Sequence, residues 1–254
     1  MILIPAFAYC ALHIIGRIHP AAFWGTDQLH YYPLSILVIF VSSCLAVFLV
    51  ATKTSWSINI DSFMTRLFEP LQEKPLWLKV LFPSLFLFAA YTFRAQSHHL
   101  GDSSKWFNEL ATALWQGEGL FSLVASDIPI FEPLDFIIHL QVYRLGHHFF
   151  AWTPADTYAY LSCIAGMFYV VSIWKITAFL CSNFTERYTF FFILLTLGSI
   201  QLFFGYGESY TLLALSSALY VLFSLRFLKG HSFAHPTLCL LFSSALHIMA
   251  LSLL

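Results

Sequence analysis

The stretch Thr157–Leu180, TYAYLSCIAGMFYVVSIWKITAFL, decides the fold class, because it is almost entirely apolar and carries one charge, Lys175. A helix needs roughly 20 predominantly apolar residues to cross the hydrocarbon core of a bilayer. Similar stretches occur along the rest of the chain, at Ile2–Ile18, Pro33–Thr52, Leu76–Phe93, Tyr188–Gly205, Ser209–Leu228 and Pro236–Leu254. They are too long for barrel strands, which cross with about ten alternating residues. The sequence therefore predicts an all-α, polytopic membrane bundle of about seven transmembrane helices.

The composition supports this class and excludes others. Of the 254 residues, 59% are hydrophobic and 10% are charged, with a mean hydropathy of +0.76, whereas a soluble domain carries about 25% charged residues. The 12 basic and 13 acidic residues nearly cancel, which excludes a nucleic-acid partner, since such proteins need a basic field. The five cysteines form no CxxC motif, so neither a disulfide framework nor a zinc site is indicated.

The distribution of Lys and Arg predicts the orientation, because cytoplasmic loops are enriched in these residues. With a cytoplasmic N-terminus, eight basic residues lie inside: Lys53, Arg66, Lys74, Lys79, Lys175, Arg187, Arg226 and Lys229. The same arrangement places nine acids outside: Asp27, Asp102, Glu109, Glu118, Asp127, Glu132, Asp135, Asp156 and Glu208. We therefore expect a multi-pass protein of a plasma (inner) membrane, with segment 94–156 on the outer face.

The chain divides into an N-terminal two-helix segment with its cytoplasmic connection, 1–75, and a membrane core, 76–254. The first stretch lacks a basic region before it and a good cleavage site, so we expect a retained span rather than a signal peptide. The sequence ends inside its last apolar run, at Leu254. We therefore expect the core to be truncated at the C-terminus.

Two amphipathic helices are predicted in the long outer segment. Pro133–Phe150 is interrupted by Asp135, His139 and Arg144, so an interfacial helix fits it better than a span. Asp135 and His139 are one turn apart and share a face, while the predicted buried side consists of Phe136, Ile137, Leu140 and Phe149. Ser103–Gln116 is the second such helix. Its predicted buried face is Trp106, Leu110, Ala113 and Leu114, opposite Lys105 and Glu109.

Three acidic motifs on the outer face are candidates for chemistry, because ionisable residues at the edge of a membrane core are costly. The first is HHLGDSS, in which Asp102 follows His98 and His99. A carboxylate here can take a proton from an acceptor hydroxyl or hold a divalent ion. The alternative is a solvated loop residue that caps the helix starting at Ser103.

The second motif is FEPLD, with Glu132 and Asp135, and the third is GYGESY, with Glu208. The start of a helix favours both proline and acids, so helix-start chemistry also explains Glu132 and Asp135. Glu208 is the only charge between Arg187 and Arg226, and a polar turn needs no carboxylate. Its function and a purely structural role remain equally open at this point.

Three basic residues lie on the outer side between the predicted third and fourth spans: Arg94, Lys105 and Arg144. An anionic head group would need one of them. Snorkelling at a span end is the ordinary explanation for Arg94. His247, in the last apolar stretch, fits a hydrogen-bonded core residue better than a ligand.

The order of these features resembles the GT-C superfamily of polytopic glycosyltransferases, relatives of protein O-mannosyltransferases and lipid A aminoarabinose transferases. The resemblance covers about Leu76–Leu254. Asp102 matches the acidic residue near the start of the first external loop in that family, and Glu208 matches a second acid in the next external loop. Glu132-Pro133-Leu134 is similar to the proline-containing stretch within the first loop. The spans Ile2–Ile18 and Pro33–Thr52 depart from the family, because they precede its usual first helix.

The resemblance implies transfer of a sugar from a polyprenyl-phosphate donor to an acceptor lipid, glycan or protein on the outer face. In that case Asp102 acts as general base or, with Glu208, as ligand to a divalent metal ion, and Glu208 also positions the acceptor. Arg94, Lys105 or Arg144 pairs with the donor phosphate, and substrate positioning falls to His98, His99, Glu132 and Asp135.

Two other functions remain open from sequence. A transporter or flippase-like protein would use the same charges to line a path, and it predicts polar or broken residues within the spans. The span interiors are nearly free of charge, which favours the enzyme. A membrane subunit without chemistry predicts that Asp102, Glu132 and Glu208 can all be replaced without effect.

Overall fold

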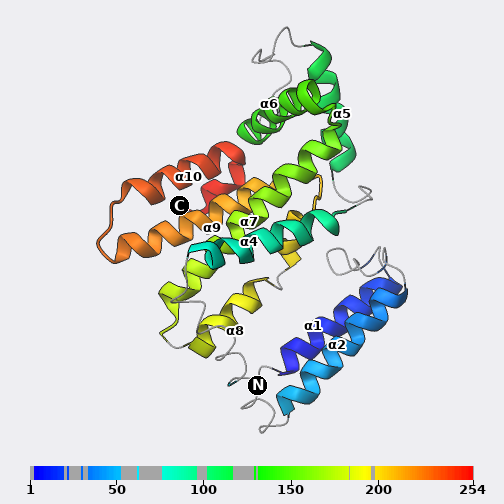
Figure 1. Cartoon of the computed structure of the whole chain (residues 1–254), viewed down its shortest axis with the longest axis vertical. Helices are drawn as coiled ribbons and strands as arrows, with labels where there is room; N and C mark the ends of the chain where they lie inside the picture. The colour runs from blue at the N-terminus through cyan, green and yellow to red at the C-terminus, as the bar shows by residue number, and fades with distance from the viewer. Residues whose placement is uncertain are drawn as a thin grey trace. The chain divides into compact units, whose positions relative to one another are not determined.

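The structure, a computed structural model, is helical throughout the part of the chain that it describes (Figure 1). The described residues are 3–19, 22, 30, 34–52, 62, 76–95, 102–116, 129, 131–182, 184–195 and 198–253. Their α-helices are α1 Leu3–Ile18, α2 Leu34–Thr52, α4 Leu76–Thr92, α5 Ser103–Gln116, α6 Pro133–Phe150, α7 Pro154–Leu180, α8 Phe184–Leu195, α9 Tyr210–Leu228 and α10 Ala234–Leu246. Two 3₁₀ helices, η3 Gly198–Phe203 and η4 Ile248–Leu253, complete these elements. The predicted all-α fold is confirmed for these ranges.

The chain forms two compact units, Met1–Gln72 and Glu73–Leu254. In the first unit α1 packs on α2, with the rings of His13 and Phe40 5.9 Å apart. The thiols of Cys10 and Cys44 join the same two helices, with 3.2 Å between the sulfur atoms. All of the predicted site residues fall in the second unit.

Helix α7 is the centre of the second unit, because it contacts α4, α5, α6, α8 and α9 (Figure 1). Its buried side chains form a core with α8, η3 and α9 that includes Tyr169, Ile173, Phe191, Phe203 and Leu222. Gly166 allows η3 to approach α7 closely, since a Cβ atom there would lie 2.5 Å from Cβ of Phe203. Helix α10 runs back along α9 and also contacts α6.

The predicted interfacial helices have the bounds of α5 and α6. Helix α5 buries Trp106, Leu110 and Ala113, as its periodicity predicts. The prediction for α6 was wrong in part, because Phe149 is exposed while Asp135 and His139 are buried beside Phe136. The reason is that α6 contacts α5, α7 and α10, so that its polar stripe faces protein.

Two predicted continuous spans are interrupted in the structure. The stretch 188–205 contains the end of α8, at Leu195, and then η3, which begins at Gly198. The stretch 236–254 contains α10, an extended residue at His247 and then η4. His247 accepts a hydrogen bond at Nδ1 from the Met249 amide (3.1 Å), and this bond stabilises the break.

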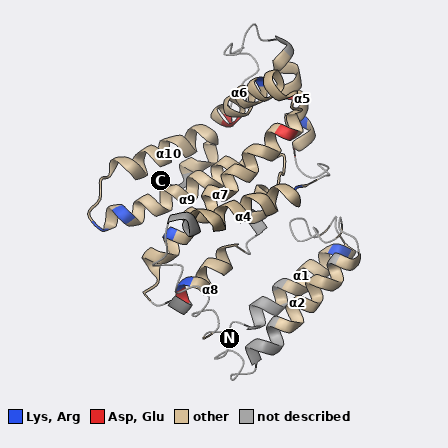
Figure 2. Ribbon diagram, viewed as in Figure 1, with Lys and Arg blue, Asp and Glu red and all other residues tan. Residues whose placement is uncertain are grey.

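Among the described helices, α7 and α9 have both the length and the hydropathy of a membrane span. Three shorter apolar helical stretches accompany them, Leu37–Ala46, Val80–Thr92 and Ala234–Leu246. Figure 2 shows that the middle parts of α7 and α9 are almost free of charged residues. The described residues thus contain two helices that are long and apolar enough to cross a membrane.

Candidate functional site

Segments that are far apart in the sequence meet where α9 begins. The amide of Ala95, after α4, donates to the Phe204 carbonyl (2.7 Å), and the amide of Asp102, before α5, donates to Glu208 Oε1 (3.1 Å). The amide of Ile248, in η4, donates to the carbonyl of Phe131, before α6 (3.0 Å). We call the four carboxylates around this junction, Asp102, Glu132, Asp135 and Glu208, the acidic site.

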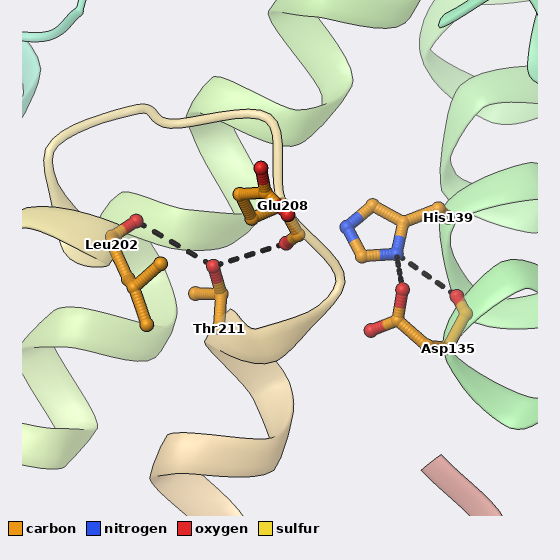
Figure 3. Close-up of polar contacts among 5 residues, drawn as sticks. All are labelled: Asp135, His139, Leu202, Glu208 and Thr211. Atoms are coloured by element: carbon orange, nitrogen blue, oxygen red, sulfur yellow. Dashed lines mark hydrogen bonds and ion pairs between the residues drawn. The ribbon is translucent and has the colours of Figure 1, made fainter. Parts of the chain in front are cut away.

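Glu208 lies in the turn between η3 and α9 and is 8% exposed. Gly207 brings this turn close to α5, since a Cβ atom there would lie 2.6 Å from Cζ of Phe107. The Thr211 hydroxyl fixes the turn from below by donating to the Glu208 and Leu202 carbonyls, at 3.3 and 3.5 Å (Figure 3). The carboxylate is therefore held in place by backbone and side-chain contacts rather than extending into solvent.

Burial raises the pKa of Glu208 from 4.5 to about 7. The hydrogen bond from the Asp102 amide acts in the opposite direction, and the charges of Asp102 and Glu132 raise the pKa further. A carboxylate with a pKa near the working pH can both accept and return a proton, which is what general acid–base catalysis requires. Glu208 thus has the burial and the pKa that such a group needs.

Asp102 is exposed, immediately before α5. Its carbonyl accepts the hydrogen bond of the Trp106 amide (3.0 Å), so Asp102 occupies the position before the first helical residue. The structure places this residue next to Glu208 through its own amide. The acidic residues of the first and third motifs therefore meet. His98 and His99, the other members of the first motif, lie outside the described residues.

Glu132 is buried at the start of α6, but its side chain makes no capping hydrogen bond there. Oε1 lies 3.0 Å from Nε2 of His247, and the Ser209 hydroxyl also hydrogen-bonds to the carboxylate. Because Nδ1 of His247 accepts the Met249 amide, Nε2 carries the proton and donates it to Glu132. Helix-start chemistry therefore does not account for this carboxylate.

Burial also raises the pKa of Glu132, while the Ser209 hydroxyl and His247 lower it. Glu132 and Glu208 act on each other electrostatically, so a proton held by one favours ionisation of the other. The two carboxylates therefore form an interacting pair within the acidic site. Ser209, which follows Glu208 in the chain, hydrogen-bonds to Glu132.

Asp135 and His139 form a buried dyad on α6, at 2% and 1% exposure. Nδ1 of His139 lies 3.1 Å from Oδ2 of Asp135 and 2.9 Å from its carbonyl oxygen. Both of these atoms are acceptors, so Nδ1 carries the proton in the neutral ring and Nε2 has the free lone pair. Figure 3 shows the imidazole between the two side chains, with its Nδ1 edge toward Asp135 and its other edge toward Glu208.

Tyr158 of α7 packs against the Asp135–His139 dyad. Its ring stacks on His139 with 4.0 Å between ring centroids, and the charges of Asp135, Glu132, Glu109 and Glu208 all act on its hydroxyl. Within the part of the chain that the structure describes, Tyr158 Oη, Asp135 Oδ1 and Glu132 Oε2 are buried with no hydrogen-bond partner. Buried polar atoms are normally satisfied, so these three oxygens are exceptions that gather at the acidic site.

The three predicted phosphate-binding residues lie at different distances from the acidic site. Arg94 is partly buried beside the turn that carries Glu208, because Gly205 packs against its Cβ, and its guanidinium lies over the Tyr91 ring (4.4 Å). Lys105 is exposed, 3.9 Å from Glu109, and its charge also acts on Glu132. Arg144 is buried further along α6 and donates to the Ala113 carbonyl (3.5 Å) near the end of α5. Arg94 and Lys105 are therefore close to the acidic site, whereas Arg144 connects α6 with α5.

Sequence reasoning did not assign His139, His247, Ser209 or Tyr158 to the site. The spacing of Asp135 and His139 is a local signal that indicates their pairing. No local signal connects His247 with Glu132, because the two residues meet only through packing of α10 on α6.

Asp102 and Glu208 of the acidic site are the predicted ligands of a divalent metal ion. Among the described residues, no three His, Cys, Asp or Glu side chains are grouped so that they could hold a metal ion. Glu208 Oε1 accepts the amide of Asp102, so the two predicted metal ligands are connected by a hydrogen bond.

No known protein family, curated protein or solved structure matches this chain.

Proposed function

We propose that this protein is an integral membrane glycosyltransferase that moves a sugar from a polyprenyl-phosphate donor to an acceptor on the outer face. The observation that carries the proposal is Glu208, a buried carboxylate with a pKa of about 7 among three further acids. An acceptor hydroxyl must lose a proton when it attacks a sugar, and this group can take it. The GT-C resemblance of the sequence agrees with the proposal.

The membrane placement is supported by the exposure of apolar residues. Only 22% of the apolar stretch of α9 is buried, whereas the core helix of a water-soluble protein would be mostly covered. Large apolar side chains such as Phe88, Phe93, Phe168 and Leu228 are exposed. We propose seven crossings, with α8–η3 and α10–η4 as interrupted spans. Irregular backbone at membrane depth requires cover by protein, and fully buried Phe203 of η3 has that cover.

In the proposed reaction the acceptor oxygen forms a bond to the anomeric carbon of the sugar. The bond from that carbon to the phosphate oxygen breaks, and polyprenyl phosphate leaves with the electron pair. The acceptor proton passes to Glu208. From there it reaches water, either directly or by way of His139. We propose that Arg94 and Lys105, which are close to the acidic site, pair with the phosphate charge. Asp102, at the exposed side of the site, orients the acceptor.

This assignment exchanges two roles of the sequence-based prediction. Asp102 was expected to be the base and Glu208 to position the acceptor. The geometry favours the reverse, because Asp102 is exposed while Glu208 is buried and has a raised pKa. No step of the proposed reaction uses a metal ion.

The donor part of the proposal predicts a bound carrier lipid. Native mass spectrometry of the detergent-purified chain is expected to show an adduct with the mass of polyprenyl phosphate or its sugar derivative. Arg94→Gln is expected to lose most of this adduct, whereas Asp102→Asn keeps it but transfers sugar more slowly. Arg187→Gln is the matched control, because Arg187 lies against Trp174, in the C-terminal half of α7. Bulk phospholipid alone, under conditions that preserve lipid adducts, would contradict a lipid-linked donor.

The dyad makes a separate prediction. In His139→Gln the amide can still donate to Asp135, but it cannot take up a proton, so the fold should persist while the maximal rate falls by roughly 100-fold. The rise of the rate near pH 7 should remain, because Glu208 is unchanged. His148→Gln, on the exposed side of the same helix, is the control and should behave as wild type. An unchanged plateau of the pH–rate profile in His139→Gln would exclude a proton-transfer role for the dyad.

A further inference from the structure

A second polar feature lies at the end of α9 opposite to Glu208, where the chain turns into α10. A cavity of about 220 Å³ is present here, lined by Phe223, Arg226, His231, Ser232 and His235. We call this cavity the basic pocket. It is separate from the acidic site, because α9 extends over 19 residues between them, or about 28 Å at 1.5 Å per residue.

The basic pocket is lined by side chains that can donate hydrogen bonds to an anion. Arg226 and two histidines line it, and Lys229 is close by in the turn. From Ser209 to the end of the sequence there is no Asp or Glu, and within the described residues none of the three basic lining side chains has an acidic partner. The pocket therefore presents the uncompensated charge of Arg226 together with two imidazoles and a hydroxyl.

Arg226 and His235 are held in place by an apolar side chain. The rings of Phe223 and His235 stack with 5.3 Å between centroids, and the guanidinium of Arg226 lies 5.9 Å from the centroid of the Phe223 ring. Two carbonyls at the end of α9, those of Arg226 and Phe227, accept the amides of Lys229, Gly230 and His231. Since no described acidic side chain pairs with the guanidinium of Arg226, it can pair with an anionic ligand.

The surroundings of the pocket indicate which anion it takes. Leu228, at 78% exposure, and Phe227 and Phe233 surround the turn with exposed apolar surface. Helix α9 is about as long as the hydrocarbon core is thick, roughly 30 Å, so its charged end falls at the level of the lipid head groups. Head groups of the cytoplasmic leaflet carry negative charge and attract basic segments.

We propose that the basic pocket binds the phosphate group of an anionic phospholipid. Arg226 pairs with the phosphate oxygens, Ser232 and the two histidines add hydrogen bonds, and the acyl chains lie on the exposed apolar side chains of the turn. This lipid is distinct from the sugar donor at the acidic site, and the binding does not depend on the proposed transfer reaction.

The test is lipid retention by the full chain. In native mass spectrometry, wild-type protein titrated with phosphatidylglycerol should retain one lipid more firmly than with phosphatidylcholine of the same acyl chains. Arg226→Gln should weaken the retained phosphatidylglycerol by about tenfold or more, as expected for loss of a charge-assisted hydrogen bond. Lys175→Gln is the matched control: it removes the same charge from an exposed position of α7 outside the pocket.

Each other outcome overturns the proposal. Equal weakening by both substitutions would mean that the overall positive charge, and not the pocket, attracts the lipid. Unchanged retention in Arg226→Gln would place the lipid elsewhere. Displacement of phosphatidylglycerol by an equal concentration of inorganic phosphate would mean that the pocket takes free phosphate and not a lipid. Arg226→Lys keeps the charge and serves as a second variant if Arg226→Gln is poorly folded.

Discussion

Replacing Glu208 by glutamine is expected to lower the rate of sugar transfer by about 100- to 10,000-fold, the range found when a general acid–base group is lost. The amide oxygen of glutamine can still accept the Asp102 amide, so the turn before α9 is preserved. The measurement is the initial rate with a polyprenyl-phosphate sugar donor at equal amounts of folded protein. Glu186→Gln, the same substitution at an exposed position of α8, should leave the rate unchanged.

The pKa of Glu208 adds two further expectations to this experiment. A base must be ionised, so the wild-type rate should rise with pH through about 7 and then level off. The stability of the folded protein should change with pH in the opposite direction to the rate. Because the folded pKa is raised from 4.5 to about 7, the stabilisation is complete below pH 4.5 and is lost as the pH rises through 7. Glu208→Gln should therefore melt at the same temperature as wild type above pH 7, or higher. A variant that keeps at least half of the wild-type rate would exclude Glu208 as the base.

Replacing Gly205 by alanine is expected to lower the transfer rate by about 100-fold, as displacement of a catalytic group by about 1 Å can do. Gly205 has φ of +75°, and a Cβ atom there would lie 2.7 Å from Cβ of Arg94. The turn that carries Glu208, or the segment after α4 that carries Arg94, must therefore shift. Both groups belong to the proposed site.

Gly230 provides a matched control for this prediction. It has φ of +90°, and no atom lies within 4 Å of a Cβ placed there. Gly230→Ala thus introduces a similar left-handed strain, about 1–2 kcal/mol, without a collision. Thermal melting should show destabilisation in both variants, larger in Gly205→Ala because of the collision, whereas only Gly205→Ala should lose activity. Equal activity in the two variants would separate the turn geometry from catalysis.

The elements that sequence reasoning predicted well are those that local patterns specify. The apolar periodicity of residues 103–116 and the proline at position 133 predicted α5 and α6 with the bounds that the structure gives. The interruptions near Gly198 and His247 were not predicted, because hydropathy averaged over a span does not register a single break. The break at His247 depends on a hydrogen bond from the Met249 amide to its own imidazole.

The meeting of the acidic motifs could be predicted only as a shared face of the membrane. The topology predicted from the sequence puts Asp102, Glu132 and Glu208 on the same side, but it contains no information on distance. The bond from the Asp102 amide to Glu208 joins residues 106 positions apart. The burial of His139 requires α5, α7 and α10 to cover α6, and that packing is a property of the whole unit rather than of the motif.

The contact between Glu132 and His247 has a consequence for biosynthesis. Chains emerge from the ribosome with the N-terminal part first, and His247 follows Glu132 by 115 positions (247 minus 132). Until α10 and η4 have been synthesised, Glu132 lacks its histidine and Phe131 lacks the amide of Ile248. The surroundings of Glu132 are therefore complete only after the last two helices of the described chain, α10 and η4, have packed on α6.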